Sequence, residues 1–167
     1  ADYIINYNIN CDKPLYKDIY KKYSTKLLLG SEYVPIREEF IGKEYIVRDS
    51  VKQVLIMTGG TDYYNFMGHF VEKICAKKLY KDIEFTFISG AYNTNLDYLQ
   101  RVAKNIDNVQ VICNVKNVSK YMRKCDLVFS AGGTTTYELC AIGVPTILFS
   151  IAENQMSESE YMGEKHI

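Results

Sequence analysis

Short apolar runs alternate regularly with segments of helical periodicity from residue 51 onward, and this alternation constrains the fold most strongly. Five runs have the length of strands that are buried on both faces and are too short for buried helices: 54–57, 85–88, 109–112, 127–129 and 146–149. The segments between them place apolar residues at helical spacing: 67–75, 96–104, 118–124 and 135–142. The alternation predicts an α/β, Rossmann-like fold, in which helices cover both faces of a parallel sheet of about five strands.

The first 50 residues lack this regular pattern. Residues 3–5 predict a short strand, residues 16–23 a weak helix, and residues 26–29 form a second apolar run. We expect residues 30–50 to be mostly loop. Because this segment contains too few apolar side chains for a core of its own, we interpret it as the edge or tail of a larger unit. Near the other end, residues 157–164 predict a partial helix.

The charges and cysteines narrow the classes of function. The length of 167 residues suggests one domain, and the 20 basic and 20 acidic residues cancel without a basic block, which argues against nucleic acid or an anionic membrane as partner. No run approaches the roughly 20 apolar residues of a membrane span, and no signal peptide opens the chain. The five cysteines are odd in number and form no CxxC pair, so we expect a cytoplasmic protein without disulfides or structural zinc. The first residue, Ala1 rather than Met, indicates a processed or excised piece.

Two glycine turns are expected to meet at one edge of the predicted sheet. In the common strand order 3-2-1-4-5, strands one and four are neighbours at the point where open sheets bind ligands. These strands end in Gly59-Gly60-Thr61 and Gly132-Gly133-Thr134. Such a turn leaves its N–H groups uncovered and, at a helix N-terminus, suits a diphosphate; the alternative is a tight turn that only packing requires. Neither turn is a GxGxxG or Walker sequence, which disfavours a conventional dinucleotide or ATP site.

Glu138 has two interpretations that its spacing does not separate. Thr135 and Glu138 are spaced as a capping box, which predicts that a helix begins at Thr135. Gly143 and then Pro145 predict the end of that helix. Glu138 can serve the cap, or it can accept hydrogen bonds from a ribose diol, as acidic residues do in nucleotide sites.

The polar loop predicted after the fifth strand, Glu153-Asn154-Gln155, also has two interpretations. Surface loops are often polar only because they are solvated. The expected position over the same crevice as the glycine turns favours hydrogen bonds to a polar ligand such as a sugar. The two histidines, His69 and His166, have no nucleophile placed beside them, so the sequence identifies no histidine base.

The block GGTTTYELCAIGVP at 132–145, followed by ENQ at 153–155, resembles the C-terminal nucleotide-sugar-binding half of GT-B proteins. The resemblance is to MurG-like glycosyltransferases of family 28, and most of all to PseG-like UDP-sugar hydrolases of pseudaminic acid biosynthesis and their spore-coat polysaccharide homologues. LLLGSEY at 27–33 and REEF at 37–40 are similar to the segment between the two domains of the PseG group. The resemblance covers nearly the whole chain; the GGTTTYEL and ENQ blocks together are fairly specific, whereas GGTD at 59–62 alone is weak.

This resemblance implies a UDP-sugar ligand and no metal or other cofactor. By the same resemblance, Glu138 binds the ribose, the backbone around Asn114 and Val115 contacts the uracil, and Asn154 and Gln155 face the diphosphate or the sugar. The two glycine turns hold the diphosphate, through Gly59, Gly60, Thr61, Gly132, Gly133 and Thr134.

The resemblance also implies that the chain is only part of an enzyme. Residues 1–50 correspond to the tail of an N-terminal GT-B domain and the interdomain segment, and residues 51–167 to the nucleotide-sugar-binding domain, truncated at its C-terminus. In the hydrolase, water releases the hexose from UDP with the help of a histidine in the N-terminal domain. We therefore expect no catalytic residue in this chain, weak UDP binding and little or no turnover. Two alternatives remain: the UDP-sugar-binding half of a MurG-like glycosyltransferase, and a non-catalytic nucleotide-sugar-binding module fused to a sugar-activating enzyme.

Overall fold

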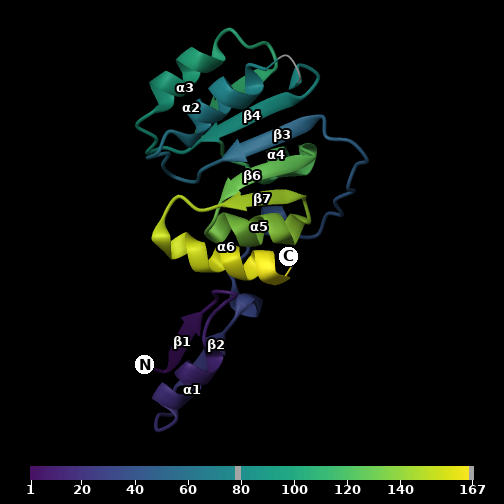
Figure 1. Ribbon diagram of the computed structural model, residues 1–167. Coiled ribbons are helices and arrows are strands. Elements are labelled where there is room, and N and C mark those ends of the chain that lie inside the picture. Colours follow the sequence, from purple (N-terminus) through teal and green to yellow (C-terminus); the bar gives the residue numbers. More distant parts are fainter. Residues whose placement is uncertain (78–79, 166–167) are drawn as a thin grey trace.

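The computed structural model describes residues 1–77 and 80–165, and contains a five-stranded parallel sheet with a small two-stranded unit at the N-terminus (Figure 1). The strands of the large sheet run in the order β5-β4-β3-β6-β7. Their bounds are Gln53–Met57 for β3, Glu84–Ser89 for β4, Val109–Cys113 for β5, Leu127–Ala131 for β6 and Thr146–Phe149 for β7. The predicted α/β class with a parallel sheet is confirmed, and the strand order is the one expected from the common doubly wound pattern.

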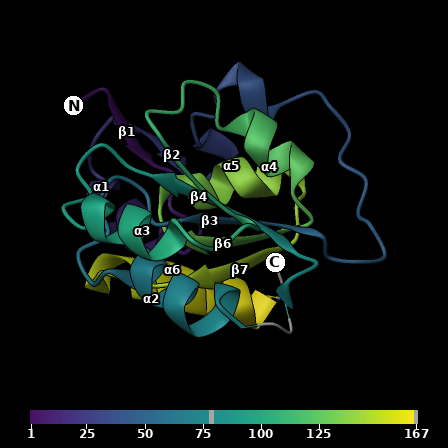
Figure 2. The same cartoon turned by 90° about the horizontal axis from the view of Figure 1, so that it is seen from above.

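Helices cover both faces of the sheet (Figure 2). One face carries α3 (Leu96–Ala103) and α2 (Phe66–Phe70), which continues as a π-helical turn (Val71–Cys75), so the single helix predicted over 67–75 is divided. The other face carries α4 (Ser119–Lys124) and α5 (Thr134–Ile142), while α6 (Glu153–Lys165) lies beside β7 (Figure 1). Within the described ranges, no helix combines the length and hydrophobicity that a membrane span requires.

The central strand β3 shows how the sequence specifies two cores. Its side chains alternate between the faces of the sheet, as the period of a strand requires. Val54 and Ile56 pack with residues of α2 and α3, whereas Leu55 and Met57 pack with residues of α4 and α5. All four are buried. Burial of such side chains stabilises the fold by about 1.5–3 kcal/mol each, which explains why this strand reads as one continuous apolar run.

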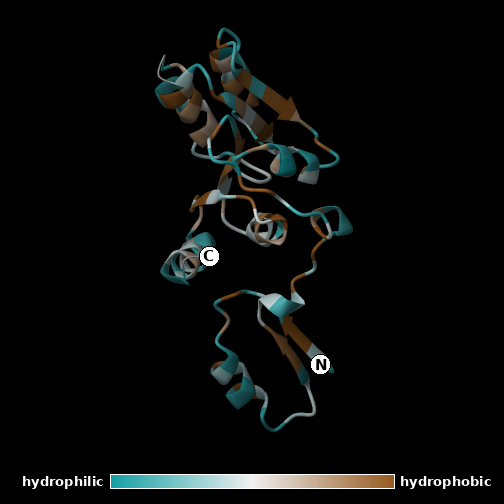
Figure 3. Cartoon of the chain, turned by 90° about the vertical axis from the view of Figure 1, so that its right-hand side faces the viewer, coloured by the Kyte–Doolittle hydropathy of each residue, from teal (hydrophilic) through white to brown (hydrophobic). Residues whose placement is uncertain are grey.

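The N-terminal unit consists of β1 (Tyr3–Asn6), α1 (Lys13–Tyr20) and β2 (Lys26–Leu29), and its two strands pair in parallel. The helix predicted over 16–23 begins earlier, because Asp12 accepts a hydrogen bond from the Leu15 N–H at 2.9 Å and Pro14 lies in the first turn, where proline is tolerated. No residue of α1 is buried. Figure 3 shows both strands as largely hydrophobic, although Tyr3 and Ile5 are exposed.

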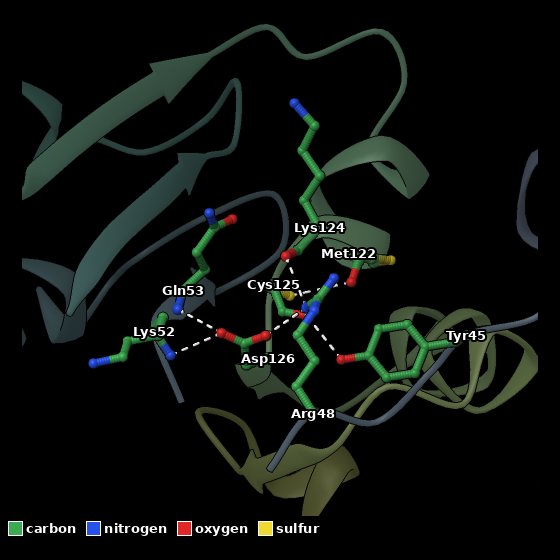
Figure 4. A network of polar contacts seen from close by, with 8 residues as sticks. All are labelled: Tyr45, Arg48, Lys52, Gln53, Met122, Lys124, Cys125 and Asp126. Carbon is green, nitrogen blue, oxygen red and sulfur yellow. Dashed lines mark hydrogen bonds and ion pairs between the residues drawn. The ribbon is translucent and has the colours of Figure 1, made fainter. Parts of the chain in front are cut away.

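The segment between β2 and β3 attaches to the sheet at two places. The first is the short 3-10 turn Glu38–Phe40, whose Phe40 is fully buried in the core beneath α4 and α5. The second is the amino edge of the sheet, where Tyr45 donates a hydrogen bond to the Cys125 carbonyl at 2.8 Å (Figure 4). Residues 30–50 are mostly loop, as expected, with a further 3-10 turn at Ser31–Tyr33.

Asp126 is the centre of the polar network at this amino edge (Figure 4). Its buried carboxylate accepts hydrogen bonds from the N–H groups of Lys52 and Gln53, both at 2.7 Å, and pairs with the Arg48 guanidinium. Burial alone raises the pKa of Asp126, but the two backbone donors and Arg48 outweigh burial and lower it below its ordinary value. The network therefore fixes the chain where it enters β3, at the end of the sheet opposite the glycine turns.

Candidate functional site

The exit turns of β3 and β6 lie side by side at the carboxyl edge of the sheet, because the two strands are paired neighbours. Both turns contain a glycine in the left-handed region of φ, 78° at Gly59 and 122° at Gly133. The turns border one cavity of about 500 Å³, which we call the glycine-turn cavity. Five of the six residues predicted to hold a diphosphate line it, namely Gly59, Gly60, Thr61, Gly132 and Thr134.

The backbone N–H groups of the second turn are not equivalent. Gly132 donates its N–H to the Phe149 carbonyl at 3.0 Å, so this group extends the ladder between β6 and β7 and does not face a ligand. Gly133, Thr134 and Thr135 come next, at the start of α5, where helical N–H groups have no partner within the helix. Thr134 and Thr135 line the cavity, so their N–H groups and the positive end of the helix dipole offer donors to an anion. Gly133, the sixth residue predicted to hold the diphosphate, is not among the lining residues, and its N–H lies near the Glu158 carboxylate.

The predicted capping box of Thr135 and Glu138 is wrong. α5 begins at Thr134 with Gly133 in the cap position, and no side chain makes the capping hydrogen bond. Thr135 already lies inside the first helical turn, so its hydroxyl cannot act as the cap. The Glu138 carboxylate turns instead toward the segment between β2 and β3, where it accepts hydrogen bonds from Arg37.

The sequence did not identify Arg37 as a site residue, and the structure places it beside Glu138. Arg37 donates from Nη2 and Nε to Glu138 Oε1 at 2.9 and 3.2 Å, and pairs with Glu39 at 2.7 Å through Nη1. The Glu138 side chain is only 13% exposed, whereas Arg37 is 55% exposed. The 101 residues that separate the two leave no local signal for the pair, so only the fold could reveal it.

A second cavity of about 320 Å³ adjoins the first, and we call it the Glu138 cavity. It is lined by Arg37 and Glu138 on one side, and by Asn114 and Val115 after β5 on another. Asn114 adopts a left-handed conformation with φ of 53°, which turns the chain sharply out of the strand. Because Gly59 and Thr135 line both cavities, the two form a continuous trough along the carboxyl edge of the sheet.

The polar loop predicted at Glu153-Asn154-Gln155 is the first turn of α6, so the helix predicted at 157–164 begins earlier. Gln155 reaches back to accept a hydrogen bond from the Ile151 N–H, before the helix begins, at 2.9 Å. Gln155 lines the glycine-turn cavity, whereas Asn154 is exposed and is not among the lining residues.

Asp62 fixes the loop that follows the first glycine turn. It is buried, and its two carboxylate oxygens accept hydrogen bonds from the N–H groups of Phe66 and Met67, at 2.8 and 3.0 Å, at the start of α2. Its carbonyl accepts hydrogen bonds from Asn65 and Asn95 at 2.9 and 2.6 Å. An aspartate a few residues before an apolar helical stretch is a capping signal that the sequence contained and that sequence reasoning missed.

The exit turn of β4 packs against the first glycine turn. Tyr92 donates its N–H to the Gly60 carbonyl at 3.0 Å. A β-carbon added at Gly90 would lie 2.2 Å from the Gly59 carbonyl oxygen, so only glycine allows the two turns to approach this closely. The wall of the trough is therefore held by a backbone-to-backbone contact.

Glu158 of α6 is a further carboxylate near the start of α5. Burial raises its pKa, and the nearby Thr136 hydroxyl and Gly133 N–H partly offset that effect. Neither Glu158 Oε1 nor Thr136 Oγ1 completes a hydrogen bond within the described residues. Among the described residues, Glu158 thus has a buried carboxylate oxygen without a hydrogen bond, close behind the N-terminus of α5.

No cluster of three or more His, Cys, Asp or Glu side chains within residues 1–77 and 80–165 could hold a metal ion. His69 is exposed on α2, 3.5 Å from Glu72, and lines neither cavity. His166 lies outside the described residues.

Among curated proteins, this chain is similar to a spore coat polysaccharide biosynthesis protein and to a UDP-sugar hydrolase. The spore coat polysaccharide biosynthesis protein SpsG of Bacillus subtilis is 21% identical over 149 residues, covering 88% of this chain and 44% of SpsG. The UDP-2,4-diacetamido-2,4,6-trideoxy-beta-L-altropyranose hydrolase of Campylobacter jejuni is 21% identical over 165 residues, covering 99% of this chain and 58% of the hydrolase. The chain thus spans about half the length of these curated relatives.

Among solved structures, the crystal structure of MurG from Acinetobacter baumannii matches with a TM-score of 0.55 at 12% identity, over 86% of this chain and 41% of MurG. This match shows a shared fold. The sequence profile of the glycosyltransferase family 28 C-terminal domain matches residues 54–161, which confirms the resemblance seen in the sequence. Since that match covers most of its length, this chain belongs to the glycosyltransferase family 28 C-terminal domain family.

Proposed function

We propose that this chain binds a UDP-sugar in the trough formed by the two cavities. The observation that carries the proposal is the meeting of two donor-rich glycine turns with a largely buried carboxylate, Glu138, along one continuous edge. Diphosphate requires donors and positive potential, and a ribose diol requires an acceptor. The trough offers both kinds of group in adjoining cavities.

The order of the ligand along the trough follows from the chemistry of its walls. The Glu138 cavity takes the nucleoside, with the uracil against the backbone at Asn114 and Val115 and the ribose at Glu138. All hydrogen bonds that Arg37 donates to Glu138 go to Oε1, so in this proposal Oε2 is the acceptor for the ribose hydroxyls. The diphosphate lies where the cavities join, against Thr134 and Thr135 at the start of α5, with Gly59 to Thr61 opposite.

The sugar then occupies the far part of the glycine-turn cavity, where Gln155 is the polar side chain from α6. Asn154 is a weaker candidate for a contact, because it is exposed and does not line that cavity. Gly132 contributes its small size rather than a donor. A β-carbon there would lie 3.2 Å from the Gln155 Cβ and 3.3 Å from the Ser159 hydroxyl.

For the parent protein we propose a PseG-like UDP-sugar hydrolase of bacterial surface-sugar biosynthesis. The name of the Campylobacter relative and the match over nearly the whole chain support it. In this proposal residues 1–50 are the tail of a second domain and the linker, and 51–167 the nucleotide-sugar-binding domain. The exposed Tyr3 and Ile5 of the two-stranded sheet favour a larger sheet there. The water-activating group belongs to that second domain. The free cysteines favour a cytoplasmic location.

Calorimetric titration of the chain with UDP, 2′-deoxy-UDP and CMP tests the binding proposal. Wild type should bind UDP more tightly than either analogue. Glu138→Ala should weaken UDP binding by about tenfold and abolish the preference for UDP over 2′-deoxy-UDP, because the ribose loses its acceptor. Glu160→Ala, which removes the same charge from an exposed position on α6, is the control and should bind like wild type.

Absence of binding to any uridine nucleotide would overturn the proposal, and a preference for CMP would shift it to a different activated sugar. The parent activity needs a separate product assay on the full-length protein. Free sugar supports the hydrolase, and an elongated acceptor would replace it with the MurG-like glycosyltransferase. Neither product would favour a non-catalytic binding module.

A further inference from the structure

Two consecutive tyrosines, Tyr63 and Tyr64, line the glycine-turn cavity although both are largely exposed, at 80% and 64%. Their rings meet edge to face, with centroids 5.1 Å apart and planes at 90°. Single exposed aromatic residues are common on protein surfaces. A paired aromatic wall beside a cavity is a less ordinary feature, because it leaves apolar area in water that a ligand could cover.

The loop that carries Tyr63 and Tyr64 is fixed by hydrogen bonds of the residues that flank it. Asp62, immediately before it, caps α2 with both carboxylate oxygens, and Asn65, immediately after it, adopts a left-handed conformation with φ of 52°. The Asn95 side chain also donates to the Asp62 carbonyl. The tyrosines therefore stand on a fixed framework, and a ligand that contacts them need not first order the loop.

The residues that line the glycine-turn cavity beside Tyr63 and Tyr64 indicate what kind of group the tyrosines could contact. Ile151 and Ala152 add apolar surface on the side of α6 and Gln155 adds a polar group there, while the rest of the lining includes Thr58, Thr61, Thr134 and Thr135. A nucleotide that fills the Glu138 cavity and places its diphosphate at the shared boundary directs its next group to this wall. The end of the cavity formed by Tyr63, Tyr64, Ile151, Ala152 and Gln155 combines aromatic and apolar surface with one amide, which suits a hexose that carries apolar substituents such as acetamido methyl groups or deoxy positions.

We propose that Tyr63 and Tyr64 form a specificity-determining platform for the hexose, and favour acetamido or deoxy sugars over fully hydroxylated ones. The inference rests on the proposed function, since it assigns the part of the ligand beyond the diphosphate. Tyrosine suits this role because it supplies a large, rigid contact area with little conformational entropy to lose.

The test is a calorimetric titration of the full chain with UDP, UDP-glucose and UDP-GlcNAc, on wild type and on the double variant Tyr63→Ala/Tyr64→Ala. Wild type should bind UDP-GlcNAc more tightly than UDP-glucose. The double variant should bind UDP within about twofold of wild type, lose roughly five- to tenfold in affinity for UDP-GlcNAc, and no longer distinguish the two sugars.

Two further variants make the result specific. Tyr63→Phe/Tyr64→Phe keeps both rings and should retain most of the preference for UDP-GlcNAc. Tyr23→Ala removes a tyrosine of similar exposure, 68%, from the N-terminal unit and should change none of the three affinities. Saturation-transfer NMR should show the acetamido methyl protons in contact with wild type, with that signal weakened in the alanine variant.

The outcomes separate the two proposals. If wild type binds no uridine nucleotide, the proposed function fails and the platform fails with it. If wild type and the double variant bind UDP alike and also share the same affinity for UDP-GlcNAc, the proposed function stands and the platform is overturned. Equal loss of UDP and UDP-GlcNAc binding also overturns it, because the tyrosines would then support the diphosphate or the loop rather than the sugar.

Discussion

Gly90 offers the sharpest test of how the trough is built, because a side chain there has no space. The added β-carbon of Gly90→Ala would lie 2.2 and 2.5 Å from the carbonyl oxygens of Gly59 and Gly60. Both neighbours are backbone atoms, so no side chain can rotate away. One turn must retreat by roughly 0.8 Å before the closer contact reaches even 3.0 Å, the lower limit that real β-carbons observe. The displaced turn is the wall of both cavities.

The expected cost follows from that geometry. Overpacking in a well-packed site destabilises by about 1–3 kcal/mol, and the upper part of this range applies because the obstacle is backbone. We expect Gly90→Ala to lower the free energy of unfolding in urea by about 2–3 kcal/mol and to weaken UDP binding at temperatures where the variant is still folded. Circular dichroism measures the first effect and calorimetry the second.

The matched control is Gly163→Ala on α6, where an added β-carbon meets no atom within 4 Å. This variant should be more stable than wild type by about 0.5–1 kcal/mol, because alanine favours the helix, and should bind UDP normally. Gly90→Ala with unchanged stability and unchanged UDP affinity would refute the packed-turn account of the trough.

Three further predictions concern acidic groups. Asp62→Ala should lower the free energy of unfolding by about 1–2 kcal/mol, measured in urea, because two N–H groups at the start of α2 lose their acceptor; an unchanged midpoint would contradict the capping role. Asp126→Asn should have a lower free energy of unfolding than wild type at pH 7, and this difference should shrink in acid. The pKa of Asp126 is lowered in the fold, so the stabilisation by its carboxylate is present above the unfolded value of 3.8 and is lost as the pH falls through the folded value. A difference in stability that does not change with pH would contradict this prediction. Glu158→Gln should behave in the opposite way, because burial raises the pKa of Glu158 and wild type therefore loses stability as the pH rises from the unfolded value of 4.5 through the folded value. The stability of the variant relative to wild type should increase toward neutral pH. Thermal melts that show the same difference at pH 4 and pH 7 would contradict this prediction.

The parts of the fold that the sequence predicted are those that depend on local patterns. β3 and β6 read as apolar runs because both faces of each strand are buried, and the glycine pairs that follow them mark turns whatever the distant contacts are. The common strand order then placed the two turns together without any knowledge of side chains.

The parts that the sequence could not predict depend on contacts between distant segments. Glu138 pairs with Arg37 across 101 residues, and this ion pair, rather than the local spacing to Thr135, decides where the carboxylate points. Gly132 was expected to offer a donor, but pairing with β7 uses its N–H. α6 begins at Glu153, four residues before the predicted start, and the Gln155 side chain is bonded back to the Ile151 N–H, a contact that no local sequence motif marked.

Titration of the ¹⁵N-labelled chain with UDP, followed amide by amide, tests the central claim most directly. The account predicts saturable shifts of the Thr134 and Thr135 amides at the start of α5 and of the Asn114 and Val115 amides in the Glu138 cavity, with one dissociation constant for all. The Lys52 and Gln53 amides, held by Asp126 at the opposite edge of the sheet, should stay fixed and serve as the internal control. Shifts confined to residues outside the trough, or no shifts at millimolar UDP, would contradict the claim that this edge of the sheet is a nucleotide site.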